Sequence, residues 1–515
     1  MSEIETCGVA SNWECSEKEI QAQGGMFDTT VSRPNVLVIV MDTARADIVG
    51  ETGVMPALHD LSEGGCRFDG CFANAPWTLP SHSSIFTGKR PSTHGVVGKG
   101  DRFETGSDLA SVLGGHGYTT AAFSNNPWIS PDFGFDSFDE FVACWKRFRR
   151  GSDLAGVSQL EGRVAQVKAI GGELLDRDAP FTLANALYMR FLRGRYDSGA
   201  RLTTRRITDW LDGRDDDRPF FAFANFMEPH LEYDPPDSYA EEYLPPDVGL
   251  EEARAVNQDP WAYLVGEEPM DERDFEILRA LYRAELSYLD DRLAELFEHL
   301  ERKDLLDDTA VFLVGDHGEN IGDHGLMDHQ YSLRESLLHV PLVARYPPSF
   351  DPGTTFEGLI ELRDLFPTVL ELARCTVPGA GSVSSTSLQS VVDSGAGREY
   401  TVAEYPVPQP SIDTLRDRYD RVTVDLSRYD RRLRSVRTTE WRYVQASDGQ
   451  DELYEVDETG RERGPVESAP DVAQELRAVL DDTLGVFSEA TNRTDTSGRE
   501  MSEANRSHLK DLGYL

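Results

Sequence analysis

Three parts of the sequence carry side chains that together could perform ester chemistry. Asp42 directly follows one continuous apolar run, and Asp316 and His317 directly follow another. Thr78 lies between these points of the chain and precedes Pro80 by two residues. Because proline is favoured in the first turn of a helix, Thr78 is expected at a helix N-terminus, where backbone N–H groups and the helix dipole attract anions.

One divalent metal could join these groups into a single site. Asp42, Asp316, His317 and Thr78 supply two carboxylates, an imidazole and a hydroxyl, and four such ligands leave room for an oxygen of a substrate. A hydroxyl bound to a metal has a lowered pKa and becomes a nucleophile. The sequence therefore predicts a metal-dependent centre in which Thr78 is both ligand and nucleophile, with a plain helix-capping role for Thr78 as the alternative.

Apolar runs predict the elements that position these residues. Continuous apolar runs are typical of parallel strands buried on both faces, and open α/β sheets place their sites at the carboxyl ends of such strands. Helices are expected over 107–115 and 272–302, and strands over 35–41, 117–124, 219–227, 309–315 and 340–345. Strands that alternate with helices predict an α/β fold, with a mostly parallel central sheet sandwiched by helices.

Changes of composition along the chain suggest two domains. The catalytic α/β domain is expected over 33–378, with a polar, helix-patterned insertion at 142–205 that could cap the site. A Gly/Ser-rich linker at 379–398 precedes a small α+β subdomain at 399–488, in which strands are expected at 400–404, 441–445 and 452–456 and a helix near 470–485. A flexible lead-in at 1–32 and a polar tail at 489–515 complete the predicted organisation.

The charge of the chain restricts its partners and its setting. A formal net charge of −40 disfavours nucleic acid and anionic membranes. Acidic residues are spread along the whole sequence and Arg exceeds Lys, a pattern typical of cytoplasmic proteins of extreme halophiles. No apolar run reaches the roughly 18 residues of a membrane-spanning helix. The acidic N-terminus lacks the features of a secretory signal, so a cytoplasmic location is predicted.

The segment 75–91 resembles the nucleophile segment of the sulfatase family, within the alkaline phosphatase superfamily. That segment reads Cys-x-Pro-x-Arg, followed by a short helix and Thr-Gly-x-x-Pro, and its Cys or Ser is converted to formylglycine. Here Thr78 occupies the nucleophile position and His82 the Arg position. Threonine carries a methyl group on its β-carbon and cannot become formylglycine, so none is expected in this chain.

Further segments extend the resemblance, in the family's order, from about residue 33 to 487. The segment 227–236 is similar to the family's Pro-His-x-x-Tyr/Phe-x-Pro-Pro segment, whose His, here His230, contacts the substrate anion or the leaving group. The segment 316–326 resembles its Asp-His/Asn-Gly block, and 441–455 its C-terminal Trp-Lys-Tyr and Glu-Leu-Tyr-Asp block. The resemblance places Asp42, Thr78, Asp316 and His317 at metal and nucleophile positions.

The chain also departs from the family's pattern at several predicted site positions. Thr43 stands where a second acid is usual, Asn125 lies near the place of a Gly-Lys-x-His segment, and His329 stands near the place of a lysine. Fewer carboxylates and more imidazole favour Mn²⁺, Zn²⁺ or Mg²⁺ over Ca²⁺ as the single divalent metal. Thr43, His82 and Asn125 are therefore predicted to contact the substrate, and His230 or His329 to protonate the leaving oxygen.

These observations predict a metal-dependent hydrolase of sulfate or phosphate esters. Phosphate esters are favoured because a sulfated threonine, unlike a sulfated formylglycine hydrate, cannot be released by elimination to an aldehyde. The substrate class is a small-molecule or a glycan or lipid ester; the oligomeric state stays open. Two alternatives stay open as well: transfer of a phosphoryl group to a sugar or lipid hydroxyl, and a non-catalytic binding protein of the same fold.

Overall fold

The computed structural model describes residues 33–103, 106–145, 199–377, 385–457 and 460–487. The chain divides into two units, Met1–Arg33 and Pro34–Leu515, and the second contains every element discussed below. The predicted lead-in, the predicted tail, and residues 146–198 of the insertion predicted at 142–205 lie outside the described residues.

An eight-stranded sheet lies at the centre of this unit, in the order β10–β2–β9–β6–β1–β5–β3–β4. Among these eight strands, β9 alone runs against its neighbours, β6 and β2. The predicted α/β fold with a mostly parallel sheet is confirmed. The strands are β1 (Asn35–Met41), β2 (Cys66–Phe72), β3 (Thr119–Ser124), β4 (Glu140–Ala143), β5 (Phe220–Phe226), β6 (Thr309–Gly315), β9 (Leu342–Arg345) and β10 (Thr354–Glu361).

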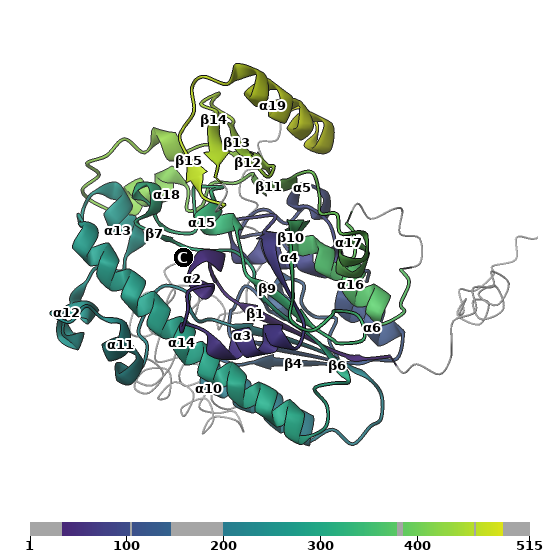
Figure 1. Ribbon diagram of the computed structural model, residues 1–515. Helices are drawn as coiled ribbons and strands as arrows, with labels where there is room; N and C mark the ends of the chain where they lie inside the picture. The colour runs from purple at the N-terminus through teal and green to yellow at the C-terminus, as the bar shows by residue number, and fades with distance from the viewer. Residues whose placement is uncertain (1–32, 104–105, 146–198, 378–384, 458–459, 488–515) are drawn as a thin grey trace, which may run out of the picture. The chain divides into compact units, whose positions relative to one another are not determined.

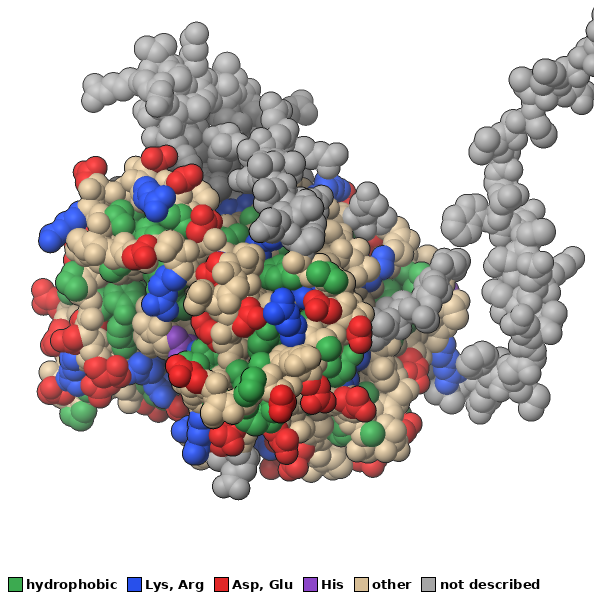
Figure 2. Space-filling model, turned by 90° about the horizontal axis from the view of Figure 1, so that it is seen from above, with side chains coloured by type: hydrophobic (Ala, Val, Ile, Leu, Met, Phe, Trp, Pro, Cys, Tyr) green, Lys and Arg blue, Asp and Glu red, His purple; other side chains and the backbone are tan. Residues whose placement is uncertain are grey.

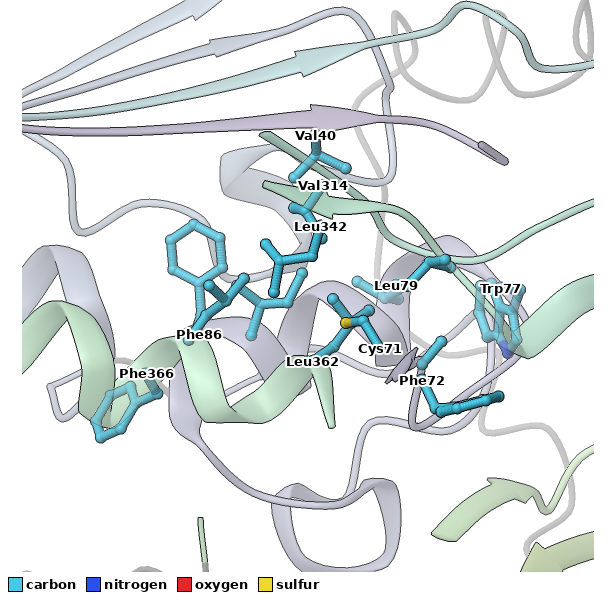
Figure 3. Close-up of a cluster of buried hydrophobic side chains, with 14 of the residues drawn as sticks. Val40, Cys71, Phe72, Trp77, Leu79, Phe86, Val314, Leu342, Leu362 and Phe366 are labelled. Atoms are coloured by element: carbon cyan, nitrogen blue, oxygen red, sulfur yellow. The ribbon is translucent and has the colours of Figure 1, made fainter. Parts of the chain in front are cut away.

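Helices cover both faces of the sheet, because successive side chains of a buried strand point to opposite faces. Val36, Val38 and Val40 of β1 belong to one apolar core, which Figure 3 shows around Leu79 and Phe86 of α4. The intervening residues Leu37, Ile39 and Met41 belong to a second core. The first core includes α4 (Thr78–Thr87), α6 (Leu109–Gly115) and α16 (Leu365–Leu372), and the second α3 (Pro56–Glu63), α10 (Ala200–Asp212) and α14 (Glu272–Arg302) (Figure 1).

Shorter elements join these layers. They are α2 (Ala46–Val49), α5 (Pro91–His94), α11 (Asp237–Tyr243), α12 (Leu250–Ala255), α13 (Pro260–Val265), α15 (Glu335–Leu338), α18 (Ile412–Arg418), the paired strands β7 (Asn320–Ile321) and β8 (Met327–Asp328), and the 3₁₀ turns η1 (Pro131–Phe133), η3 (Asp323–Gly325), η4 (Leu362–Asp364) and η5 (Ser427–Tyr429). None of the helices in the described parts of the chain is both long enough and apolar enough to cross a bilayer.

The strands that sequence reasoning missed do not form continuous apolar runs. In β2, Arg67 and Asp69 pair with each other and reach solvent, so its first half does not resemble a buried strand. In β10, the first residues are exposed and the last three are buried. Strands at one side of the sheet are half-covered, and a search for continuous apolar runs therefore passes over them.

A five-stranded antiparallel sheet lies near the C-terminal end of the described chain. Leu476 and Leu480 of α19 (Pro470–Leu484) pack on one of its faces. Tyr405, Leu433 and Tyr454 of the sheet belong to the first core of the large sheet. Its strands are β11 (Thr401–Tyr405), β12 (Leu433–Arg437), β13 (Trp441–Ala446), β14 (Glu452–Val456) and β15 (Glu462–Arg463). The range 379–398, predicted as a linker, includes the helix α17 (Leu388–Ser394).

A hydrogen bond to the buried carboxylate of Glu361 joins the two sheets, and ion pairs surround this carboxylate. Glu361, at the end of β10, accepts a hydrogen bond from the backbone N–H of Val402 in β11 at 2.8 Å. Its carboxylate also pairs with Arg363 at 2.5 Å and with Arg90 at 3.3 Å. Burial alone would raise the pKa of Glu361, but the neighbouring guanidinium groups, including that of Arg398, outweigh burial and lower this pKa from 4.5 to about 2.

Acidic side chains on one face of the molecule are scattered rather than gathered in one patch. On the face shown in Figure 2, red carboxylates alternate with blue basic groups over the described residues. Scattered charge of one dominant sign keeps a protein hydrated and does not by itself form a docking site.

The substitution Glu361→Gln should destabilise the protein by about 3–5 kcal/mol at pH 7, because it leaves buried guanidinium groups without their counter-charge. A carboxylate with a lowered pKa stabilises the fold above pH 4.5 and loses this effect as the pH falls towards 2. The deficit of the variant in denaturant unfolding should therefore narrow between pH 5 and pH 3. Exposed Glu371→Gln is the matched control, and a deficit independent of pH would contradict the assignment.

Candidate active site

Two carboxylates meet at the carboxyl edge of the large sheet. Met41 of β1 pairs with Gly315 of β6 in parallel register, so the next residues, Asp42 and Asp316, are neighbours. Both side chains are fully buried. The backbone N–H of Thr43 donates to Asp316 Oδ1 at 3.1 Å, which fixes the orientation of that carboxylate.

Helix α4 begins at this edge, and Thr78 is its first residue. The Ser81 hydroxyl donates to the backbone oxygen of Asp316 at 2.7 Å. His82 Nδ1 lies 2.9 Å from the backbone oxygen of Thr78, to which it donates, and 3.4 Å from Asp316 Oδ2. One turn of the helix is thus bound to the residue that ends β6, and the prediction that Thr78 lies at a helix N-terminus is confirmed.

The unprotonated ring nitrogen of His317 lies close to the other three predicted ligands. Its Nδ1 donates to the backbone oxygen of Gly318 at 2.9 Å, which leaves Nε2 as an acceptor. Nε2 lies 3.3 Å from Thr78 Oγ1, 3.3 Å from Asp316 Oδ2 and 3.7 Å from Asp42 Oδ1. The structure therefore brings all four predicted metal ligands together.

This donor set fits a divalent cation. Asp42 Oδ1 and Asp316 Oδ2 are buried and have no hydrogen-bond partner among the described residues. Leaving a buried carboxylate oxygen unpaired is costly, and a cation placed among these atoms would satisfy both. Asp42, Asp316 and His317 each offer a ligand atom, and these atoms lie within 4.8 Å of one another.

Burial also shifts the pKa values of the ionisable groups in this site. Burial, and then the charge of Asp42, raises the pKa of Asp316 well above its ordinary value. Burial, and then the neighbouring His329, lowers the pKa of His317. Burial also lowers the pKa of His82 to about 4, so His82 is neutral near pH 7. Buried carboxylates next to neutral imidazoles again call for a cation.

Two more histidines adjoin this centre. The His329 ring lies 4.6 Å from the His317 ring, and the His230 ring lies 5.3 Å from the His329 ring, measured between centroids. His230 Nδ1 contacts the backbone oxygen of Leu231. Burial would lower the pKa of His329, but the carboxylates of Asp328 and Glu319 outweigh it and raise this pKa well above its ordinary value. His329 thus lies beside the predicted metal ligand His317, and His230 lies beside His329.

The predicted substrate residues lie around the same edge in different settings. Thr43 has a left-handed backbone (φ 62°), and its buried hydroxyl has no hydrogen-bond partner among the residues that the structure describes. A β-branched residue rarely adopts this conformation, which is a feature of strained functional sites. The Asn125 side chain lies against Gly199, at the start of α10. No contact tests the substrate roles of Thr43, His82 and Asn125, and these roles stay predictions.

Asn126, which sequence reasoning did not assign to the site, directly contacts Asp42, one of the predicted metal ligands. Its Nδ2 donates to Asp42 Oδ2 at 2.6 Å, and its Oδ1 accepts from the backbone N–H of Trp128 at 2.9 Å. Two adjacent asparagines after a strand were a signal, but the sequence does not show which of them turns towards Asp42. The structure favours Asn126.

Comparisons with known proteins agree in pointing to one family. Residues 34–375 match a family model described as Sulfatase. An arylsulfatase of Clostridium perfringens is 23% identical over 415 residues, which cover 75% of this chain and 85% of that protein.

The crystal structure of a phosphonate monoester hydrolase of Agrobacterium radiobacter matches with a TM-score of 0.65 and 19% identity, covering 87% of this chain and 95% of the other. A structure of BT4656 in complex with its substrate D-glucosamine-2-N,6-O-disulfate matches with a TM-score of 0.63 and 18% identity, covering 88% and 97% of the two chains.

The substitution Asn126→Leu should weaken divalent-metal binding by about 10–100-fold, because hydrogen bonds to metal ligands orient them. Chelator competition with Mn²⁺ or Zn²⁺ measures the affinity, and thermal unfolding of the metal-free protein reports any general loss of stability. A variant that is destabilised but binds metal as tightly as the wild type would show that Asn126 shapes only the loop.

Proposed function

The chain belongs to the sulfatase family, whose members are hydrolases acting on ester bonds, and from that premise we propose that it cleaves sulfate or phosphate esters with Thr78 as the nucleophile. One observation carries the proposal. Thr78 begins a ten-residue helix, and its buried hydroxyl lies 3.3 Å from His317 Nε2. Beside it are two carboxylate oxygens that have no hydrogen-bond partner in the described parts of the chain.

Asp42, Thr78, Asp316 and His317 would hold the cation. A divalent ion bound there would lower the pKa of the Thr78 hydroxyl and offset the negative charge of a bound ester. The imidazole among the ligands favours Mn²⁺, Zn²⁺ or Mg²⁺ over Ca²⁺. The structure adds that His317 is held in the tautomer a ligand needs, through its bond to Gly318.

The chain's own groups account for two chemical steps. Thr78 Oγ1 gives up its proton to water and attacks phosphorus, so that a Thr78 O–P bond forms while the bond to the ester oxygen breaks. His230 or His329 donates a proton to that leaving oxygen. The first N–H groups of α4 point towards the anion and stabilise its remaining oxygens. Water then attacks phosphorus, the Thr78 O–P bond breaks, and the threonine regains a proton.

The threonine favours phosphate esters over sulfate esters. Each cycle must end with water attacking the substituted threonine, since a threonine ester has no aldehyde form through which it could be eliminated. Hydrolysis of a sulfated threonine is demanding, whereas a phosphorylated nucleophile is a common enzymatic intermediate. Small-molecule, glycan or lipid esters are the substrate class that we propose.

The solvent conditions form part of the proposal. The net charge of −40 supports a protein that works in multimolar salt in the cytoplasm, as its composition predicts. Assays should therefore be run in multimolar KCl, in which charge repulsion within the chain is screened.

The substitution Thr78→Val removes the hydroxyl and keeps the shape of the side chain, and it should lower turnover by at least about 10³-fold. The assay compares aryl phosphate, bis-aryl phosphate, aryl phosphonate and aryl sulfate esters, each with Mn²⁺, Zn²⁺, Mg²⁺ or Ca²⁺. Phosphoester turnover should exceed sulfate turnover.

The conservative variant Thr78→Ser is the matched control and should keep measurable turnover, because it retains a hydroxyl at the same position. If Thr78→Val remained active, Thr78 would not be the nucleophile. If wild-type sulfate turnover depended on Thr78 and exceeded phosphate turnover, the argument about release of the intermediate would be wrong.

A further inference from the structure

A second group of possible metal ligands lies beside the predicted centre. Glu319, Asp328 and His329 each offer one ligand atom, and these atoms lie within 4.8 Å of one another. His329 Nδ1 is 2.6 Å from Asp328 Oδ1 and 3.3 Å from Glu319 Oε1. We propose that these three residues bind a second divalent cation, with the imidazole nitrogen and both carboxylates as its ligands.

The environment of the Glu319 carboxylate is the main support for a bound cation. Glu319 is fully buried, and its Oε2 has no hydrogen-bond partner among the described residues. Its other oxygen shares His329 Nδ1 with Asp328, so one N–H faces two carboxylates. A single proton satisfies this arrangement poorly, whereas a cation in place of that proton would contact both carboxylates and the ring nitrogen.

Local structure holds these ligands in position. The short strands β7 and β8 pair Asn320 with Asp328, which brings Glu319 next to the segment containing Asp328 and His329. Asn320 Nδ2 donates to the backbone oxygen of Asp328 at 2.9 Å, and Ser336 Oγ donates to Asn320 Oδ1 at 2.7 Å.

A buried guanidinium holds the other end of the cluster. Arg45 Nη1 donates to the backbone oxygen of Glu319 at 3.0 Å. Such outer contacts orient ligands in metal sites, and here they come from three separate parts of the chain.

The balance of charge supports two cations rather than one. Asp42, Asp316, Glu319 and Asp328 are four buried carboxylates around one edge of the sheet. A protonated His329 would compensate one of them and one divalent ion two more, so a second ion in place of the His329 proton would complete the compensation. The two ligand sets adjoin, since the rings of His317 and His329 are 4.6 Å apart.

A second cation would sharpen the proposed function, on which this consequence rests. Paired metal ions stabilise both the attacking and the leaving oxygen in the transfer of a phosphoryl group. Phosphate monoesters carry more negative charge than sulfate monoesters, so a pair of cations favours phosphate esters. A His329 nitrogen that binds metal no longer serves as an acid, and His230 remains to protonate the leaving oxygen.

Counting metal ions tests this proposal on the full-length protein. The wild type is stripped with a chelator, loaded with excess Zn²⁺ or Mn²⁺ in multimolar KCl, desalted and analysed by elemental mass spectrometry. About two ions per chain are expected. Glu319→Gln and Asp328→Asn should each retain about one, while the exposed control Glu371→Gln should retain about two. Anomalous diffraction at the zinc edge should place a peak among Glu319, Asp328 and His329.

A wild type that saturates at one ion, with no anomalous peak in this cluster, would overturn the proposal and leave His329 paired with the two carboxylates through its proton. This result does not depend on whether the variants fold, because it is obtained on the wild type. Metal content is measured without substrate, so it is separate from the loss of turnover in Thr78→Val. Either the second ion or the threonine nucleophile can therefore fail alone.

Discussion

The placement of two buried carboxylates side by side is the constraint around which this structure is arranged. The parallel register of β1 and β6 makes Asp42 and Asp316 neighbours, and each keeps one oxygen without a hydrogen-bond partner among the described residues. Two charged carboxylates in this position are costly, so either a proton on one of them or a cation between them must offset the repulsion. The surrounding contacts hold the pair in place and do not neutralise it: an N–H of Thr43 fixes one carboxylate, and an amide of Asn126 fixes the other.

Helix α4 contains buried polar residues because its first turn packs against these carboxylates. All ten of its residues are buried, although its middle includes Ser81, His82, Ser83 and Ser84. Two of these serine hydroxyls are satisfied within the helix, since Ser83 donates to the backbone oxygen of Leu79 and Ser84 to that of Pro80. Ser81 and His82 instead face Asp316. The polar residues therefore do not mark a solvent face: one side of the helix lies against the apolar core in Figure 3 and its first turn against the charged edge.

Sequence reasoning succeeded where the physical signal is local and strong. The continuous apolar runs of β1 and β6 and the helical spacing of α14 predicted these elements with their observed bounds, and the residues that follow the strands meet because parallel strands end at one edge. It named Asn125 and passed over Asn126, because the loop after β3 decides which side chain turns towards Asp42. It also missed the pairing of Glu319 with the 328–329 segment, since β7 and β8 are two residues each and leave no periodic pattern.

Two departures from the family's pattern change the charged groups beside the proposed metal centre. Position 43, where the family usually carries a second acid, holds a threonine with a left-handed backbone that costs about 1–2 kcal/mol. Near the place of a lysine in the family's pattern stands His329, which groups with the carboxylates of Glu319 and Asp328. In the mechanism that we propose, the substrate's ester oxygen departs when Thr78 attacks, and water opens the threonine ester once in each cycle. Positive charge held near the departing ester oxygen would assist the first of these two steps.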